Sequence, residues 1–394
     1  MREANGVSGN AVIPSAGIAR NIGIDLLRGL AIVLVILNHI GIRIPLKKTL
    51  LAEFLPRSFL SNLNYNGYEA VFVFFVISGF LIAGNALRRW GDLARIDIKT
   101  FYALRFSRIV PCLLLLLAVL SVLHGLGVQD YVIDRPGQSL PRAILVALGL
   151  HLNWYEGMTG YLPGNWDVLW SLSIEEAFYI GFPIVCLLTR RVWILVPLLL
   201  VLVVSMPWTH MALTGNEIWQ EKAYLPGMSA IAIGVIGALL ARRFSVLPTV
   251  PARALIVIGA LGMLAEMFEG RVLWPIMGDS ILLLLTVSVM LMLIGLQARA
   301  ATSVRGIGWL ASWGRLSYEI YLSHMFVVYA VVRVYRSTGS DIRWGFLWYL
   351  LALPLCWLLG KAVARFVSIP CERLLRARML RSSGERAVCA TPEN

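Results

Sequence analysis

Charged residues are scarce in this chain of 394 amino acids. Asp, Glu, Lys and Arg together make up 14% of it, whereas apolar residues make up 58% and the mean hydropathy is +0.75. A typical soluble domain carries about 25% charged residues. The polar stretches between the apolar runs are also far shorter than the roughly 50 residues that a small domain needs. The protein is therefore predicted to work within a membrane or at its faces.

Cysteine is sparse too. The five cysteines show no paired spacing, and three of them, Cys112, Cys186 and Cys356, lie in apolar runs. Disulfide frameworks and zinc sites both need cysteines at short, regular separations. Neither is predicted here, and no metal cofactor is expected.

Basic residues exceed acidic ones by a wide margin, with 35 Lys and Arg against 22 Asp and Glu and a net charge of +13. A nucleic-acid-binding protein concentrates such charge on one face or along one helix. Here the Lys and Arg form short clusters between apolar runs, which is typical of the orientation signals of membrane proteins. Membrane lipid is therefore an expected partner, and nucleic acid is not.

Apolar runs of roughly 20 residues, the length that crosses a bilayer as a helix, recur from end to end. They predict an all-α polytopic membrane protein with about ten transmembrane helices. The expected spans are residues 22–42, 66–87, 109–127, 166–189, 192–207, 223–241, 253–269, 276–297, 309–333 and 345–367. The apolar segment 143–154 would be only about 18 Å long as a helix, so it is expected not to span.

With ten spans, every strong basic cluster falls on one side of the membrane, and the positive-inside rule places both termini in the cytoplasm. An eleventh span at 143–154 would put the later clusters opposite the earlier ones. The clusters are residues 88–108, Arg190-Arg191, Arg242-Arg243, residues 299–305 and the C-terminal tail.

The predicted organisation has three parts. Residues 1–20 form a polar cytoplasmic segment, residues 21–370 form the transmembrane domain, and residues 371–394 form a basic cytoplasmic tail. The first helix resembles an uncleaved signal anchor. We expect a multi-pass integral membrane protein of the bacterial cytoplasmic (inner) membrane.

The first span carries two polar side chains on one face. Arg28 and His39 are eleven residues apart, about three helical turns plus 20°, so they lie on one stripe about 16 Å apart. Such groups are costly inside a bilayer unless they face protein or a water-filled cavity. The stripe is predicted to form one wall of a functional site.

Two later spans carry ionisable groups at a similar depth. Glu175 and Glu176 are adjacent on one, and Tyr318 and His324 lie on the other. Three helices with such groups at one depth are what a buried reaction centre requires. The alternative for a single His is that it only hydrogen-bonds a neighbouring helix, and this alternative stays open for His324.

Two details refine this picture. Glu175 and Glu176 point about 100° apart on a helix, so one is expected to face the cavity and the other to serve as an internal salt-bridge or interfacial partner. The aromatic-rich run 71–82 is typical of helix packing, and its Ser78-Gly79 pair indicates a close approach between helices. Ser78 is retained as a further candidate site residue.

A pair of arginines marks the predicted membrane boundary. Arg105 and Arg108 are three residues apart and therefore share a helix face. Arginine at such a boundary often serves only as an anchor whose charged end reaches water. The functional alternative is a two-arginine clamp for a phosphorylated ligand, because guanidinium groups bind phosphate through two parallel hydrogen bonds.

Five motifs in register resemble the acyltransferase-3 family of integral-membrane acyltransferases, and the resemblance covers nearly the whole chain. One motif departs from the family, since Glu372-Arg373-Leu374 lacks the expected proline, and the hydrolase-like domain that follows in some members is not expected. The motifs are Arg28 with His39, VFVFFVISGFLI at 71–82, Arg105-x-x-Arg108 with Pro111, WSLSIEEAFY at 170–179 and SYEIYLSH at 317–324.

The resemblance implies transfer of an acyl group, commonly acetyl, from acetyl-CoA or another acyl-CoA to a hydroxyl group of a carbohydrate or glycosylated acceptor. It implies that His39 is the catalytic histidine and that Arg28 is its motif partner. It also implies that Arg105 and Arg108 contact coenzyme A phosphates, and that Glu175 is the recurring acidic residue.

The residues themselves are compatible with this chemistry. A sugar hydroxyl needs a general base near neutral pH, and histidine is suited to that role. The hypothesis is that His39 takes the acceptor proton while Glu175 or a tyrosine hydroxyl orients its ring. A covalent route through His39 or a serine also remains open. So do two other classes of protein, a proton-coupled transporter that uses the same buried groups and a scaffold subunit of a glycan-export complex.

Overall fold

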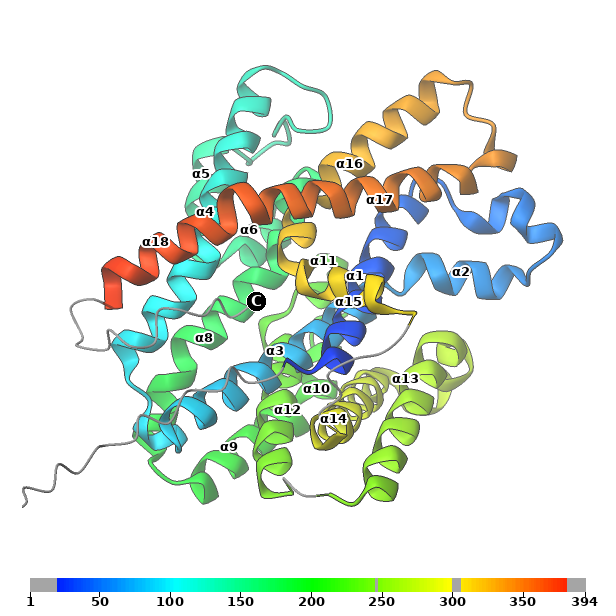
Figure 1. The fold of residues 1–394 in the computed structure, drawn as a ribbon. Helices are drawn as coiled ribbons and strands as arrows, with labels where there is room; N and C mark the ends of the chain where they lie inside the picture. Colours follow the sequence, from blue (N-terminus) through cyan, green and yellow to red (C-terminus); the bar gives the residue numbers. More distant parts are fainter. Residues whose placement is uncertain (1–19, 245–246, 300–305, 381–394) are drawn as a thin grey trace, which may run out of the picture.

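The computed structural model describes residues 20–244, 247–299 and 306–380. Within these ranges the secondary structure is helical and contains no strand, which confirms the predicted all-α class (Figure 1). Three predicted features lie wholly or partly outside the described residues. They are the N-terminal segment up to residue 19, the part of the basic cluster at 300–305 and the tail from residue 381 onward.

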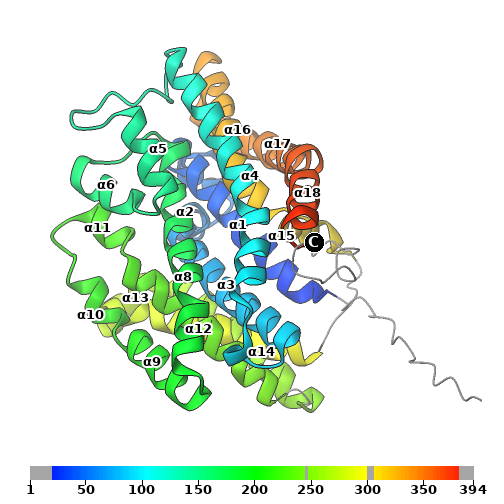
Figure 2. The same ribbon diagram turned by 90° about the vertical axis from the view of Figure 1, so that its left-hand side faces the viewer.

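The described chain is a succession of helices of very different lengths joined by short connections. Their bounds are α1 Ile22–Gly41, α2 Arg57–Tyr65, α3 Gly67–Trp90, α4 Ile98–Gly125, α5 Leu140–Leu148, α6 Leu152–Thr159, α7 Gly164–Asp167, α8 Leu169–Thr189, α9 Val192–Val204, α10 Met206–Met211, α11 Glu217–Glu221, α12 Tyr224–Arg243, α13 Thr249–Met277, α14 Ile281–Arg299, α15 Gly308–Arg315, α16 Ser317–Ser337, α17 Phe346–Val363 and α18 Ile369–Leu380. The short helices α5, α6, α10 and α11 gather on one side of the molecule, at the left of Figure 2.

Among the described residues, seven helical stretches are long and apolar enough to cross a membrane. They are Ile22–Gly41, Gly67–Trp90, Ile98–Gly125, Gly164–Thr189, Glu217–Arg243, Thr249–Arg299 and Phe346–Leu380. The stretch Thr249–Arg299 contains two helices, α13 and α14, which pack side by side (Figure 1). The chain is an integral membrane protein, and the number of ten spans and the orientation of the termini stay predictions.

Segment 143–154 does not form one helix. It is divided between α5 and α6, and Leu150 between them has a φ of 58°, in the left-handed region. Neither helix belongs to the long apolar stretches.

Several predicted spans have other bounds in the structure. The fifth, 192–207, is divided at Ser205 into α9 and α10, and α9 is shorter than the seven long stretches. The third predicted span, 109–127, belongs to a helix that begins at Ile98, so the arginine pair lies on α4 itself. The ninth, 309–333, is broken after Arg315 into α15 and α16. The break follows Gly314, where a Cβ would lie only 1.8 Å from the carbonyl oxygen of Asp25. Backbone contact with α1 therefore holds α15 in place, and the chain turns before α16 begins.

The predicted close approach at Gly79 is confirmed. A Cβ at Gly79 would lie 1.9 Å from the carbonyl oxygen of Ile231 on α12, and one at Gly234 would lie 2.0 Å from that of Val76. Small residues on both helices allow this contact between backbones. It anchors α3, which carries Ser78 on an adjacent face.

Five helices surround the candidate site, and their contacts show how they run. On α1 and α16, Arg28 contacts Ser317 and His39 contacts His324, so these two helices run in the same direction. Ile109 of α4 pairs with Tyr318 near the start of α16, and Asp130, in the connection after α4, pairs with Arg333 near the end of α16, so α4 runs with them. The start of α3 lies at the end of α1, so α3 runs antiparallel to α1. α8 runs parallel to α3, because Tyr68 contacts Trp170 and Ser78 bonds to Glu175.

Candidate active site

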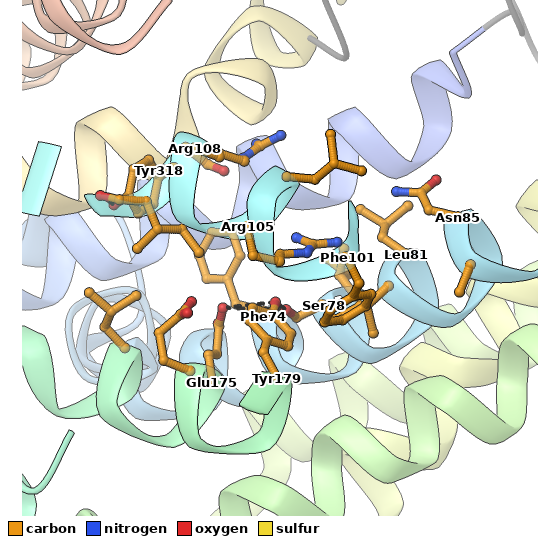
Figure 3. A pocket seen from close by; sticks show the side chains of 18 of the residues that line it. Phe74, Ser78, Leu81, Asn85, Phe101, Arg105, Arg108, Glu175, Tyr179 and Tyr318 are labelled. Carbon is orange, nitrogen blue, oxygen red and sulfur yellow. Dashed lines mark hydrogen bonds between the residues drawn. The ribbon is translucent and has the colours of Figure 1, made fainter. Parts of the chain in front are cut away.

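A cavity of about 340 Å³ is lined by residues of α1, α3, α4, α8, α16 and α18 (Figure 3). Its body is apolar and includes Val71, Phe74, Ile77 and Leu81 of α3. Six arginines also line it, and several of them come from the basic segment at the end of α3 and the start of α4. These arginines are Arg28, Arg88, Arg89, Arg105, Arg108 and Arg376.

The predicted arginine pair faces this cavity. Arg105 and Arg108 both line it and are both half-buried. The Arg105 guanidinium lies 4.9 Å from the centre of the Tyr179 ring, and Figure 3 shows its side chain above Phe74 and Ser78. Neither arginine forms an ion pair with a carboxylate in the described part of the chain. Arginines without carboxylate partners beside a cavity suit an anionic ligand.

A hydrogen-bonded cluster joins α3 to α8 on the floor of the cavity. The Ser78 hydroxyl donates to Oε2 of Glu175 at 3.3 Å, and the Tyr179 hydroxyl donates to the same oxygen at 3.3 Å. Ser78 and Tyr179 also contact each other directly, as Figure 3 shows. The fold thus places Glu175 under Arg105 and does not bring its carboxylate to the His39 ring.

Both adjacent glutamates line the cavity, which corrects the expectation that one of them would point elsewhere. The cavity is lined by α3 and α4 as well as by α8. It is therefore wide enough for both Glu175 and Glu176 to reach it, although their side chains leave α8 about 100° apart. Glu176 forms no ion pair with a described residue, and its Oε1 is buried without a hydrogen-bond partner among them.

The end of the cavity away from the α3–α4 connection is formed by α1 and α16. There the Arg28 guanidinium donates to the Ser317 hydroxyl at 2.8 Å, and the Tyr318 hydroxyl donates to the carbonyl of Ile109 at 2.8 Å. Arg28 and Tyr318 therefore hold three helices together beside the cavity. Arg28 lines the cavity, whereas His39, which was predicted on the same wall, does not. The role of this wall in a functional site stays a prediction.

His39 and His324 meet across α1 and α16, with ring centres 5.1 Å apart. His324 is fully buried, and its Nδ1 lies 2.7 Å from the carbonyl oxygen of Tyr321. Because a carbonyl only accepts, Nδ1 must carry the proton, and in the neutral ring Nε2 is left as an acceptor. That Nε2 has no hydrogen-bond partner among the described residues. The two candidate histidines thus form one pair, one member of which presents an unused lone pair.

Some residues that line the cavity were not among the candidate site residues. Ser171 and Tyr321 line the cavity near the histidine pair and bond to each other at 2.8 Å. The signal was present in the spacing, because Ser317, Tyr321 and His324 recur at intervals of four and three residues and so share one face of α16. Trp170 and Phe74 support this region from neighbouring helices.

A second charged cluster lies apart from the cavity and was also missed. Lys222 is 2% exposed, and its Nζ donates to Oε2 of Glu156 at 2.6 Å and to Asp167. The same ammonium lies 4.5 Å from the centre of the Tyr161 ring. Burial and the Asp167 carboxylate raise the pKa of Glu156, against the opposing effect of Lys222. The cluster ties α6 to the segment that precedes α12.

The thiols and acidic groups outside this region show no metal-binding arrangement. Within the described ranges, no group of three or more His, Cys, Asp or Glu side chains is placed to hold a metal ion. Cys112, Cys186, Cys356 and Cys371 carry free thiols, and Cys389 lies outside the described residues. The acid–base groups at the site are therefore the histidine pair, the two glutamates and the tyrosines.

The family model and the relatives that match this chain are all described as acyltransferases. A family model described as an acyltransferase domain matches residues 21–361. A Staphylococcus aureus (strain COL) protein, named provisionally as an O-acetyltransferase, is 29% identical over 167 residues. The peptidoglycan O-acetyltransferase OatA of Listeria monocytogenes is 27% identical over 169 residues, and the O-acetyltransferase OatA of Staphylococcus aureus (strain NCTC 8325) is 28% identical over 174.

Each of these matches covers 41% of this chain but only 24–25% of the relative. The chain therefore matches only about a quarter of the length of each of these relatives. No solved structure matches the chain with comparable significance.

Proposed function

Because the chain belongs to the acyltransferase-3 family, whose model matches residues 21–361, we propose that it is a membrane-embedded O-acyltransferase. It moves an acyl group, most simply acetyl, from an acyl-CoA to a hydroxyl group of a carbohydrate or glycosylated acceptor. The names of the relatives describe O-acetyl transfer, and one of them specifies peptidoglycan for the Listeria protein. The bacterial cytoplasmic membrane is the proposed location.

One observation carries this proposal. A cavity lined by arginines leads from the basic α3–α4 connection to within one helical turn of a histidine pair. Arg105 and Arg108 have no carboxylate partner among the described residues, and their chemistry suits the phosphates of coenzyme A. The apolar body of the cavity suits the pantetheine arm. The distance of about 16 Å between Arg28 and His39 along α1 is close to the length of that arm.

The histidine pair supplies the acid–base chemistry. His39 takes the proton of the acceptor hydroxyl as its oxygen attacks the thioester carbon. A C–O bond forms, the C–S bond breaks, and the proton passes to the thiolate that leaves. His324 is bound through Nδ1–H to the Tyr321 carbonyl, so its free Nε2 can accept a hydrogen bond from the His39 ring and hold it in orientation.

Glu175 has a different role in this proposal from the one expected for it. Its carboxylate accepts hydrogen bonds from Ser78 and Tyr179, and the Tyr179 ring lies under Arg105. We assign Glu175 to positioning Arg105 for the acyl donor. Arg28, bonded to Ser317, holds α1 and α16 at the spacing that the histidine pair needs.

The test measures coenzyme A release and ester formation by the purified full-length protein in lipid vesicles, with acetyl-CoA and a carbohydrate acceptor. His39→Ala should lower the rate by a factor of about 100 or more, since general base catalysis contributes about 10²–10⁴. His124→Ala is the matched control, because His124 lies at the end of α4 and bonds to the backbone of Ile133. A transporter would release no coenzyme A, and a His39→Ala rate equal to the wild type would exclude this residue as the base.

A further inference from the structure

The acyl-donor cavity stops just short of the histidine pair. Its lining includes Ser171, Tyr321 and Leu322, whereas His39 and His324 are not part of it. The ring centre of Tyr321 lies 5.9 Å from that of His324, and the ring centres of His324 and His39 lie 5.1 Å apart. The Tyr321 ring therefore forms the part of the cavity wall that adjoins His324.

Tyr321 is held in this position from two neighbouring helices. The Ser171 hydroxyl of α8 donates to the Tyr321 hydroxyl at 2.8 Å, and Ser171 is 6% exposed. On the other side, the Phe74 ring of α3 meets Tyr321 edge-on, with centres 6.5 Å apart and planes at 70°. A ring fixed by a hydrogen bond and an aromatic contact is a wall of defined shape.

We propose that Tyr321, braced by Ser171 and Phe74, sets the length of the acyl group that the enzyme transfers. The inference rests on the proposed function and adds a specificity determinant to it. The thioester carbon has to come within about 3–3.5 Å of the attacking oxygen at the histidine pair. The carbon then sits at the end of the cavity that adjoins His324, where the rest of the acyl chain has to lie against the Tyr321 ring.

The consequence depends on the size of the acyl group. Acetyl has one methyl group beyond the carbonyl and fits beside the ring. Each further methylene needs volume that the Tyr321 and Phe74 rings already occupy, and packed interiors do not yield such volume without displacing side chains. The chemistry of transfer is unchanged: the C–S bond breaks, the C–O ester bond forms, and the acceptor proton ends on the thiol.

The opposite end of the cavity has no comparable constraint. It is the arginine-lined region near Asn85 and Trp90, where the cavity meets the basic α3–α4 connection. The aliphatic side chains of Ile77 and Leu81 line the body of the cavity, where the pantetheine arm of the donor would lie. This arm is the same in every acyl-CoA. Selection by acyl length is therefore confined to the Tyr321 end.

The test compares acetyl-, butyryl- and hexanoyl-CoA as donors for the full-length protein in lipid vesicles, with one carbohydrate acceptor. The wild type should prefer acetyl over hexanoyl by about tenfold or more, the discrimination that methylene groups allow in an apolar pocket. Tyr321→Ala should shift the ratio of kcat/KM values by about tenfold or more toward the longer chains. Tyr321→Phe keeps the ring and should stay close to the wild-type preference.

The matched control is Tyr335→Ala. Tyr335 lies on the same helix and is also buried, but its ring packs on Trp348, with centres 6.0 Å apart, and its hydroxyl donates to the Ser340 carbonyl. This variant loses a comparable side chain and should keep the preference for acetyl. It separates a general loosening of α16 from removal of the wall.

The outcomes distinguish the two levels of the proposal. A wild type that releases coenzyme A from none of the donors overturns the proposed function and this inference with it. An active wild type with a Tyr321→Ala variant that still prefers acetyl overturns the inference alone. Should Tyr321→Ala be inactive, equilibrium binding decides: it should bind hexanoyl-CoA at least as tightly as acetyl-CoA, and a preserved acetyl preference overturns the inference.

Discussion

Two groups of cations in this protein have opposite surroundings. Lys222 is buried and has two carboxylate partners, Glu156 and Asp167. Arg105 and Arg108 line a cavity and have no such partner among the described residues. A buried charge that is neutralised within the fold holds helices together, whereas one that is left without a carboxylate is available to a ligand. Lys222 therefore belongs to a structural cluster, whereas Arg105 and Arg108 belong to a candidate binding site.

The largest effect on stability is expected at the paired cluster. Above pH 8, where Glu156 is ionised, Lys222→Met removes the ammonium and leaves the carboxylates of Glu156 and Asp167 close together without compensation. Removing one partner of a buried pair typically costs about 3–5 kcal/mol. The free energy of unfolding, measured in detergent, should fall by about this amount. Adding Glu156→Gln should recover part of the loss, and an unchanged stability would show that the cluster does not hold the helices.

At the unpaired arginines the effect should appear in binding. The double variant Arg105→Ala with Arg108→Ala should raise KM for acetyl-CoA by about 100-fold or more, because it removes at least two hydrogen bonds to a charged group and each contributes about 1.5–3 kcal/mol. Its unfolding should change little. An S-acetyl pantetheine donor, which lacks the nucleotide phosphates, is the control. An equal loss with both donors would mean that the arginines do not bind phosphate.

A smaller effect is expected from pH at the paired cluster. Burial and Asp167 raise the pKa of Glu156 to about 8, above its unfolded value of about 4.3. The folded protein therefore binds an additional proton between these values, so stability from this group is greatest at low pH and is lost as pH rises toward 8. Glu156→Gln should flatten the dependence of the melting temperature on pH in that window, and an unchanged slope would argue against this assignment.

The smallest effect is expected at an exposed ion pair, which belongs to neither group. Arg333 and Asp130 lie 3.0 Å apart, with side chains 55% and 28% exposed. Solvent screens such a pair, which contributes about 0–1 kcal/mol. Arg333→Ala should leave both the unfolding free energy and KM for acetyl-CoA nearly unchanged. A large change in either would mean that exposure is a poor guide to which cations matter here.

The fold class and the polar wall of α1 were predictable from local sequence. Length and hydropathy identify the long apolar helices, and the helical repeat alone places Arg28 and His39 on one face. The structure agrees, since both side chains contact residues of α16. These features follow from residues that are near one another in the chain.

Pairings between distant helices were not predictable in the same way. Glu175 bonds to Ser78 and Lys222 to Glu156, and each pair depends on how the helices pack over 66 or more residues of chain. In the described part of the chain Glu175 bonds to Ser78 and Tyr179, so the hypothesis that Glu175 or a tyrosine hydroxyl orients the His39 ring stays a prediction. The break before Ser317 is similar, because it depends on contact between Gly314 and the backbone of α1.

The shared direction of α1 and α16 restricts how the chain is threaded through the bilayer. α16 is not among the seven stretches that are long and apolar enough to cross a membrane. Were it to cross in the direction of α1, the number of crossings between them would have to be odd, and a lone additional crossing at α5 and α6 would break this parity. The connection after α16 lies beside the one after α1, where Gly345 approaches Ile44 and the Tyr349 hydroxyl of α17 donates to the Ile44 carbonyl. Both connections thus emerge at the end nearer His39 and His324, from which the acceptor of the proposed reaction would have the shorter approach.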